Sequence, residues 1–251
     1  MATALNLGYS VASGDIVIKS DADQLLDKNS LINIVRHFSK TEIGAVSGRQ
    51  ILLKETKQER GYRSLIDLKR LVENKLDSIY LLEPFSAFRK NLIEPIDPTS
   101  LSDESELALK IRRKGYRIIF DPEATFYEEI PSKFIPRLKL KQRRAQGYVQ
   151  VMIKNLDMCL NRKYGYFGLL IYPLNFLMII ITPWLILSSF IWLPYLISIP
   201  ELIPIMAMLG ITIYLIGKPS FIAGFIEANL ALVIAQIILL FKGPEYIWSR
   251  P

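Results

Sequence analysis

The pattern of hydrophobic and polar positions divides this chain into two unequal parts. Residues 1–164 mix short apolar runs with many charged residues, whereas residues 165–241 contain three charged residues in all. A segment of about 20 apolar residues is long enough to cross a bilayer as a helix. We therefore expect a polar domain followed by a membrane region of about three helices. The segments expected to span the membrane are residues 171–199, 202–217 and 221–241.

Short runs of β-branched and aromatic residues predict four strands within the polar part. These runs are Ile16–Ile18, Ile43–Ser47, Phe85–Arg89 and Tyr116–Phe120. The last strand is expected to end at Asp121-Pro122. Stretches with helical periodicity separate the runs. Because alternating strands and helices are typical of an α/β domain, we expect an α/β fold with a mostly parallel sheet over residues 1–132.

Two of the expected helices are well marked. The first covers residues 59–80, where apolar residues recur at helical spacing. Its expected inward face consists of Leu65, Leu68, Leu71, Val72 and Leu76. The second covers residues 103–114 and stops at Gly115. Asp103 and Glu106 form a capping-box-like pair at its start, with Asp103 as the expected N-cap.

Candidate chemistry lies directly after the first strand, where Asp21 and Asp23 are spaced by one residue. Side chains of an extended backbone alternate sides, so both carboxylates are expected to point the same way. Ligands of open α/β sheets bind at the carboxyl ends of the strands. Two adjacent carboxylates favour a divalent cation such as Mg²⁺ or Mn²⁺, which bridges to substrate phosphates. The competing interpretation is a polar turn, in which aspartate is common.

Composition narrows the classes of site and partner. The formal net charge is +7, and the single cysteine, Cys159, excludes an internal disulfide. The lone histidine, His37, falls in a helical pattern and is expected on the surface of that helix. It is not expected to bind zinc, because the sequence has no second His or Cys cluster with which to build a zinc site. A carboxylate inside an apolar, membrane-spanning segment is costly, so Glu227 is expected to face other helices rather than lipid.

The positive charge gathers directly before the apolar part, in residues 133–164. Apolar residues sit among these charges, and a basic amphipathic segment next to a membrane region is typical of an interfacial helix. By the positive-inside rule this side is cytoplasmic. No DNA- or RNA-binding motif accompanies the charge, so we expect no nucleic-acid partner. The basic residues are Lys133, Arg137, Lys139, Lys141, Arg143, Arg144, Lys154, Arg162 and Lys163.

A series of motifs in a fixed order covers most of the chain. The series is Ala4-Leu5-Asn6 with Gly8, Gly14–Val17, Asp21-Ala22-Asp23, Phe85–Lys90, Ser102–Leu107, Gly115-Tyr116-Arg117, Gln142–Gly147 and Tyr246-x-Trp248. In this order the motifs resemble the processive and dolichyl-phosphate-type branches of the family 2 glycosyltransferases. These are membrane-attached enzymes with a GT-A catalytic domain. The resemblance implies a multi-pass membrane protein whose GT-A domain, over residues 1–132, faces the cytoplasm.

The resemblance also implies a reaction, the inverting transfer of a hexose from a nucleotide sugar to a lipid or polysaccharide acceptor. A metal held by Asp23, with Asp21 nearby, would stabilise the nucleoside diphosphate that leaves. Glu104, with Asp103 as its neighbour, matches the position of the catalytic base. The matching Gln/Arg motif places Gln142, Arg143 and Arg144 at the substrate. A phosphate acceptor would need no base, because it is already an anion.

Each of these residues also has a purely structural interpretation. Asp103 is a good N-cap, and Glu104 is an acidic residue suited to the first turn of a helix. Arg143 and Arg144 could instead contact lipid headgroups. The chain departs from the family in having Glu104 where the acidic pair ends in Asp, and its Gln/Arg motif lacks a clear tryptophan.

The first strand–helix units of the family, which bind the nucleotide base, have no counterpart here. We therefore expect a GT-A domain that lacks its N-terminal part. The alternative, from another class, is a catalytically inactive truncated membrane protein with a binding or scaffolding role.

Overall fold

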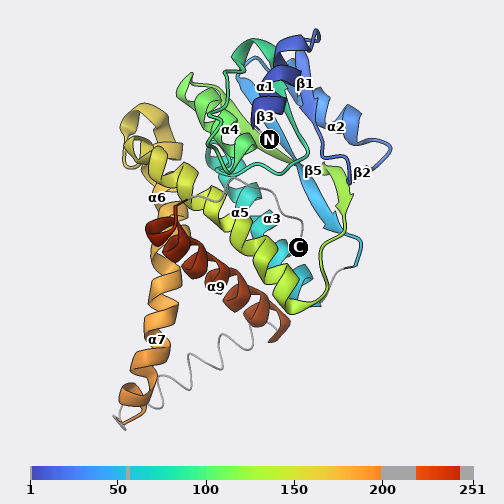
Figure 1. Cartoon of the computed structure of the whole chain (residues 1–251). Coiled ribbons are helices and arrows are strands. Elements are labelled where there is room, and N and C mark those ends of the chain that lie inside the picture. The colour runs from blue at the N-terminus through green and yellow to red at the C-terminus, as the bar shows by residue number, and fades with distance from the viewer. Residues whose placement is uncertain (1, 55–56, 199–218, 244–251) are drawn as a thin grey trace.

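The computed structural model describes residues 2–54, 57–198 and 219–243 (Figure 1). A mixed sheet with small helices around it forms the upper body, and longer helices lie below it. The strands are β1 (Ile16–Lys19), β2 (Leu25–Leu26), β3 (Ile43–Leu52), β4 (Ser86–Arg89) and β5 (Arg117–Glu128). The helices are α1 (Ala2–Val11), α2 (Ser30–Arg36), α3 (Lys57–Leu76), α4 (Asp103–Arg113), α5 (Phe134–Lys154), α6 (Tyr172–Phe176), α7 (Thr182–Ile197) and α9 (Pro219–Phe241).

The five strands of the sheet lie in the order β1-β4-β3-β5-β2. Only β3 and β5 are parallel, and the other three pairings are antiparallel. The α/β class is therefore confirmed, but the expectation of a mostly parallel sheet is wrong. Alternation along the chain reports the order of elements and not their directions. Here β4 runs back between β1 and β3, although the 20-residue helix α3 precedes it.

Strand β5 does not end at Asp121-Pro122 as expected but continues to Glu128. Its pairing with β3 shifts register between Phe120 opposite Ser47 and Thr125 opposite Arg49. An irregularity of this kind lets a strand contain a proline, which cannot donate to a regular ladder. The buried carboxylate of Asp121 lies at this shift and contacts Nε2 of His37 at 2.7 Å, so His37 is bound to the sheet rather than free on a helix surface.

Helix α3 is rotated relative to the sequence prediction. Leu68 and Val72 are at least half exposed, whereas Arg70 and Glu73 are buried. The buried charges have partners: Arg70 pairs with Glu83 at 2.6 Å, and Glu73 with Lys69 at 2.8 Å. Helical periodicity identified the helix, but these ion pairs decide which face is covered.

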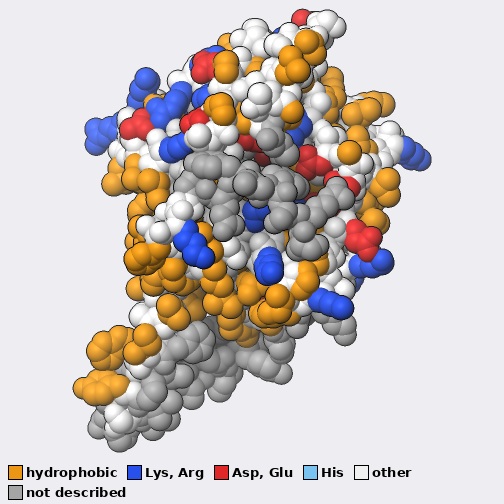
Figure 2. Space-filling model, viewed as in Figure 1, with side chains coloured by type: hydrophobic (Ala, Val, Ile, Leu, Met, Phe, Trp, Pro, Cys, Tyr) orange, Lys and Arg blue, Asp and Glu red, His pale blue; other side chains and the backbone are white. Residues whose placement is uncertain are grey.

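Two helical segments of the described residues are long and apolar enough to cross a membrane, Phe167–Ser189 and Ile222–Phe241. The third expected span, residues 202–217, lies outside the described residues, as does the Tyr246-x-Trp248 motif. Large apolar side chains such as Leu185 and Ile191 are exposed on these helices. Figure 2 shows hydrophobic side chains gathered on the lower part of the molecule, with Lys and Arg side chains above them.

Candidate active site

The carboxyl end of β1 and the first turn of α4 meet at one buried lysine. Lys19 is the last residue of β1, and its side chain is 6% exposed. Its Nζ lies 3.0 Å from Oδ1 of Asp21 and also donates to Oε1 of Glu104. The structure therefore brings together two of the residues that the sequence marked, Asp21 and Glu104. It does so through a residue that the sequence analysis did not mark.

The segment before α4 is held in place by α5. The backbone N–H of Leu101 donates to Oε1 of Gln150 at 2.9 Å. Gly147 lies so close that a Cβ there would be 2.6 Å from the carbonyl oxygen of Leu101. Only a residue without a side chain permits this approach. These contacts fix where α4 begins, and so where Glu104 is placed.

The start of α4 differs from the expected capping box. Ser102 is the N-cap, and its side chain makes no capping hydrogen bond. Glu106 does not reach back to the helix start but accepts from the backbone N–H of Asp97 and pairs with Lys110 at 2.6 Å. Asp103 belongs to the first turn of the helix and is buried. The expectation of Asp103 as an N-cap is therefore wrong, and its carboxylate is left for the site.

Asp103 and Tyr9 are two further buried titratable groups that interact with Glu104. Burial, followed by the negative charge of Glu104, raises the pKa of Asp103 to about 6. Burial, again followed by Glu104, raises the pKa of Tyr9 to about 12. For Lys19, burial alone would lower the pKa, but Glu104 and Asp21 outweigh it and raise the pKa above its usual value. Lys19 is accordingly a fixed positive charge among acidic groups.

Asp21 and Asp23 lie in a turn rather than on an extension of β1. The N–H of Gln24 donates to the carbonyl of Asp21 at 3.2 Å. The alternation argument for two carboxylates on one side of a strand therefore does not apply. Asp23 is exposed, and the side chain of Asp21 is 36% exposed.

The carboxylate oxygens of this turn are suitable ligands for a hard divalent cation. Within the described part of the chain, no group of three His, Cys, Asp or Glu side chains is placed to hold a metal. Two accessible carboxylates do fit Mg²⁺ or Mn²⁺, which are commonly held by one or two carboxylates together with substrate phosphates and water.

The Gln/Arg motif lies on α5. Arg144 donates to Oε1 of Glu128 at 2.6 Å and is not directed to a lipid surface. Burial and the charge of Arg144 lower the pKa of Arg143, while Glu128 and Asp21 oppose them. Arg143 is thus within electrostatic reach of the Asp21 turn. Gln142 is partly buried, with no described contact to the turn.

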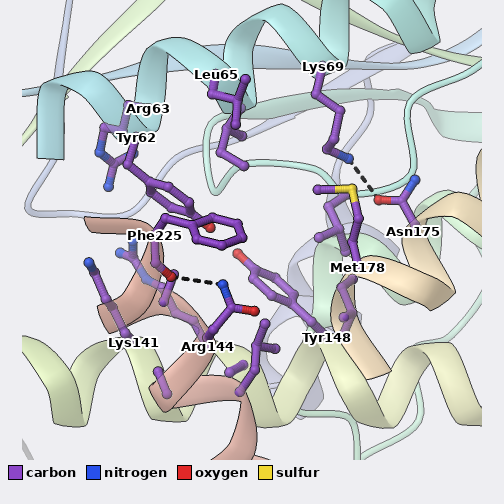
Figure 3. A pocket seen from close by; sticks show the side chains of 18 of the residues that line it. Tyr62, Arg63, Leu65, Lys69, Lys141, Arg144, Tyr148, Asn175, Met178 and Phe225 are labelled. Carbon is purple, nitrogen blue, oxygen red and sulfur yellow. Dashed lines mark hydrogen bonds between the residues drawn. The ribbon is translucent and has the colours of Figure 1, made fainter. Parts of the chain in front are cut away.

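A cavity of about 380 Å³ lies between α3, α5, α9 and the segment from α6 onward. Figure 3 shows Tyr62 from α3, Tyr148 from α5 and Phe225 from α9 pointing toward one another across it. Charged groups also line it, including Lys69, which donates to Oδ1 of Asn175 at 2.7 Å. The cavity is therefore mostly apolar, with paired charges at its edges.

Tyr148, which lines this cavity, is a buried phenol with acidic neighbours. Burial, together with Glu83, raises the pKa of Tyr148, and Glu104 contributes to the same shift. Arg144 and Tyr148 both line the cavity, and Arg144 is adjacent in sequence to Arg143, which senses Asp21.

Sequence reasoning missed three residues that build this site. Lys19 is the clearest, and its signal was visible: a lysine ends a strand of Ile-Val-Ile, directly before the aspartates. Tyr9 and Gly147 gave weaker signals. Gly147 was quoted only as part of a motif, and its role follows from a packing distance that a sequence does not contain.

Comparison with known proteins agrees with this fold. The family model described as "Glycosyl transferase family group 2" matches residues 79–216. A mannosyltransferase from Pyrobaculum calidifontis, solved with GDP-Man and Mn²⁺, has a similar fold with a TM-score of 0.75. It is 24% identical, and the match covers 96% of this chain and 66% of that one. This likeness confirms the GT-A fold.

Curated relatives share part of their length with this chain. Poly-β-1,6-N-acetyl-D-glucosamine synthase from Staphylococcus aureus (strain COL) is 25% identical over 164 residues, which are 61% of this chain and 40% of the relative. The synthase of the same name from Staphylococcus epidermidis is 24% identical over the same shares. The chain therefore spans less than half the length of the curated relatives it matches.

Proposed function

The chain belongs to glycosyl transferase family group 2, and on this premise we propose that it transfers a hexose from a nucleotide sugar, with inversion, to a lipid or polysaccharide acceptor. The observation that carries the proposal is the meeting of Asp21 and Glu104 at Lys19. It puts the carboxylate turn of the donor side next to the carboxylate of the base. The reaction takes place at the cytoplasmic face of a membrane.

The proposed roles follow from the chemistry of the transfer. Glu104 takes the proton of the acceptor hydroxyl as its oxygen forms a bond to the anomeric carbon. The bond from that carbon to the diphosphate breaks at the same time. When bound at Asp21 and Asp23, Mg²⁺ or Mn²⁺ supplies charge neutralisation to the leaving diphosphate. Arg143 adds positive charge on the same side, and Gln142 contacts the substrate beside it. Asp103, buried beside Glu104 on the first turn of α4, is a second acidic group at the same centre.

The cavity between α3, α5 and α9 suits the acceptor. Aromatic and aliphatic side chains line it together with charged groups, and part of its wall comes from the apolar helices. Its position supports a lipid-linked or growing saccharide acceptor that approaches Glu104 from the membrane side. A lipid phosphate would be deprotonated before it arrives, so Glu104 would then be dispensable.

One observation favours the second candidate function, a catalytically inactive membrane protein with a binding or scaffolding role. Lys19 already engages one oxygen of each carboxylate. Ion pairing alone would therefore account for the burial of Glu104, without any reaction.

The deciding experiment measures release of nucleoside diphosphate from a panel of UDP- and GDP-sugars. Membranes from cells that express the chain are supplied with Mn²⁺ and compared with Asp23→Asn and Glu104→Gln membranes. We expect metal-dependent release by the unaltered chain and loss of at least about 100-fold in Glu104→Gln, the usual scale of general-base catalysis. No release from any sugar would favour the inactive protein. Full activity of Glu104→Gln would favour a phosphate acceptor.

A further inference from the structure

Lys19 is more deeply buried than either of the groups that it contacts. Its side chain is 6% exposed, against 13% for Glu104 and 36% for Asp21. A lysine is rarely buried unless it is paired, because removing an ammonium from water is costly. Here the cost is offset by two carboxylates, one local and one distant in sequence: Asp21 is two residues away and Glu104 is 85 residues away.

The two contacts join the two halves of the proposed reaction centre. Asp21 belongs to the turn that follows β1, and Glu104 to the first turn of α4. An ammonium has three donors on a tetrahedral nitrogen, so two carboxylates that share it are held at a restricted separation. Asp103 adds a further acidic group beside Glu104, and without Lys19 these three carboxylates would repel one another.

We propose that Lys19 is a positioning residue for the transfer. Its ammonium holds the carboxylate of Glu104 at a fixed place relative to the donor-side carboxylate of Asp21, and it competes with the divalent cation for Asp21. The predicted effect of Lys19 on catalysis rests on the proposed function. Its predicted effect on binding of the divalent cation depends only on the charges of this chain.

The catalytic part predicts a specific change in kinetics. In Lys19→Met the side chain keeps its length and loses its charge, so Glu104 is no longer held beside the donor. Misplaced catalytic groups cost about 100-fold in rate when they move by about 1 Å. We expect kcat to fall by about 30- to 100-fold on that scale, while KM for the nucleotide sugar changes by less than about threefold.

Two further variants separate positioning from a general structural role. Lys19→Arg keeps the charge and has donors for both carboxylates, so it should recover part of the lost kcat, although its planar guanidinium differs in shape from an ammonium. Lys114→Met is the matched control, since Lys114 also pairs with a carboxylate, that of Glu94 at 2.8 Å, but lies at the other end of α4. It should leave kcat unchanged. A Lys19→Met enzyme with unaltered kcat would overturn the proposal.

The metal part is tested without any turnover. Removing a positive charge next to Asp21 removes repulsion toward a bound cation and frees a carboxylate oxygen. Coulomb's law at these separations in a partly solvated site predicts that the Kd for Mn²⁺ falls by about three- to tenfold in Lys19→Met. Binding is followed on the detergent-solubilised chain by the electron spin resonance of free Mn²⁺.

A double variant keeps the metal-binding test valid if Lys19→Met alone does not fold. Lys19→Met leaves the largely buried Glu104 carboxylate without its ammonium, which is destabilising, whereas Lys19→Met with Glu104→Gln removes both charges. The double variant should bind Mn²⁺ more tightly than Glu104→Gln alone. Equal Mn²⁺ affinity in these two proteins would overturn the proposal even if the unaltered chain proves inactive. Absence of turnover with tighter Mn²⁺ binding would instead refute the proposed function and retain Lys19 as the competing cation.

Discussion

Arg137 on α5 and Glu227 on α9 form a two-point ion pair, with Nε–Oε1 at 2.8 Å and Nη2–Oε2 at 2.9 Å. Both side chains are less than 10% exposed. Glu227 lies within an otherwise apolar helix, where an unpaired carboxylate would be expensive. The sequence prediction that Glu227 faces other helices is confirmed. The pair explains how an apolar helix docks on the basic helix α5.

Removing one partner of this pair should be costly. Glu227→Gln leaves the buried guanidinium of Arg137 with Glu59, whose nearest oxygen is 3.8 Å away. Loss of one member of a buried pair typically destabilises by about 3–5 kcal/mol. We expect a clear drop in the melting temperature of the detergent-solubilised chain, partly recovered in Arg137→Met with Glu227→Leu. The control Glu94→Gln breaks an exposed pair and should cost less than about 1 kcal/mol.

Asp103 should make stability depend on pH in an unusual direction. Its pKa is raised to about 6 in the folded chain, against about 3.9 when unfolded. Because the folded state binds the proton more tightly, stability falls as pH rises through this window, and the penalty is complete above pH 6. Asp103→Asn removes the charge and should stabilise the chain by about 1–3 kcal/mol at pH 7.5. Thermal melts should show no difference at about pH 3, below the unfolded pKa, and a less stable variant at pH 7.5 would contradict the raised pKa of Asp103.

Local sequence signals predicted the elements well, because strand runs and helical periodicity depend on neighbouring residues. The strand at Ile16 and the helix at Asp103 are both found. What failed depends on distant partners. Strand directions and the covered face of α3 are decided by pairings across the fold, whereas the turn at Asp21 is local and agrees with the competing interpretation of the sequence. The contact between Lys19 and Glu104 joins residues 85 positions apart, so no local pattern contains it.

Gly147 should tolerate no side chain. A Cβ would lie 2.6 Å from the carbonyl oxygen of Leu101 and 3.0 Å from Cβ of Ser102, so α5 or the start of α4 must move. Gly147→Ala should therefore lower kcat by about 100-fold, the usual cost of a shift of about 1 Å in a catalytic group. Gly8→Ala is the control, since a Cβ there meets nothing within 4 Å. Because Gly8 lies in the helix α1, Gly8→Ala should stabilise the chain by about 1 kcal/mol. If Gly147→Ala were as active as Gly8→Ala, the predicted clash at Gly147 would be wrong.

Orientation in the membrane can be tested with single cysteines in a Cys159→Ser background. Lys139 is exposed on α5, in the basic segment that the positive-inside rule places in the cytoplasm. Lys139→Cys should therefore resist a membrane-impermeant thiol reagent in intact cells and react in inverted vesicles. Ser198 is exposed and follows α7, beyond the candidate span Phe167–Ser189. If that segment crosses the bilayer once, Ser198→Cys should show the opposite behaviour. Labelling at Lys139→Cys but not at Ser198→Cys in intact cells would reverse the orientation, and the site would then lie away from cytoplasmic nucleotide sugars.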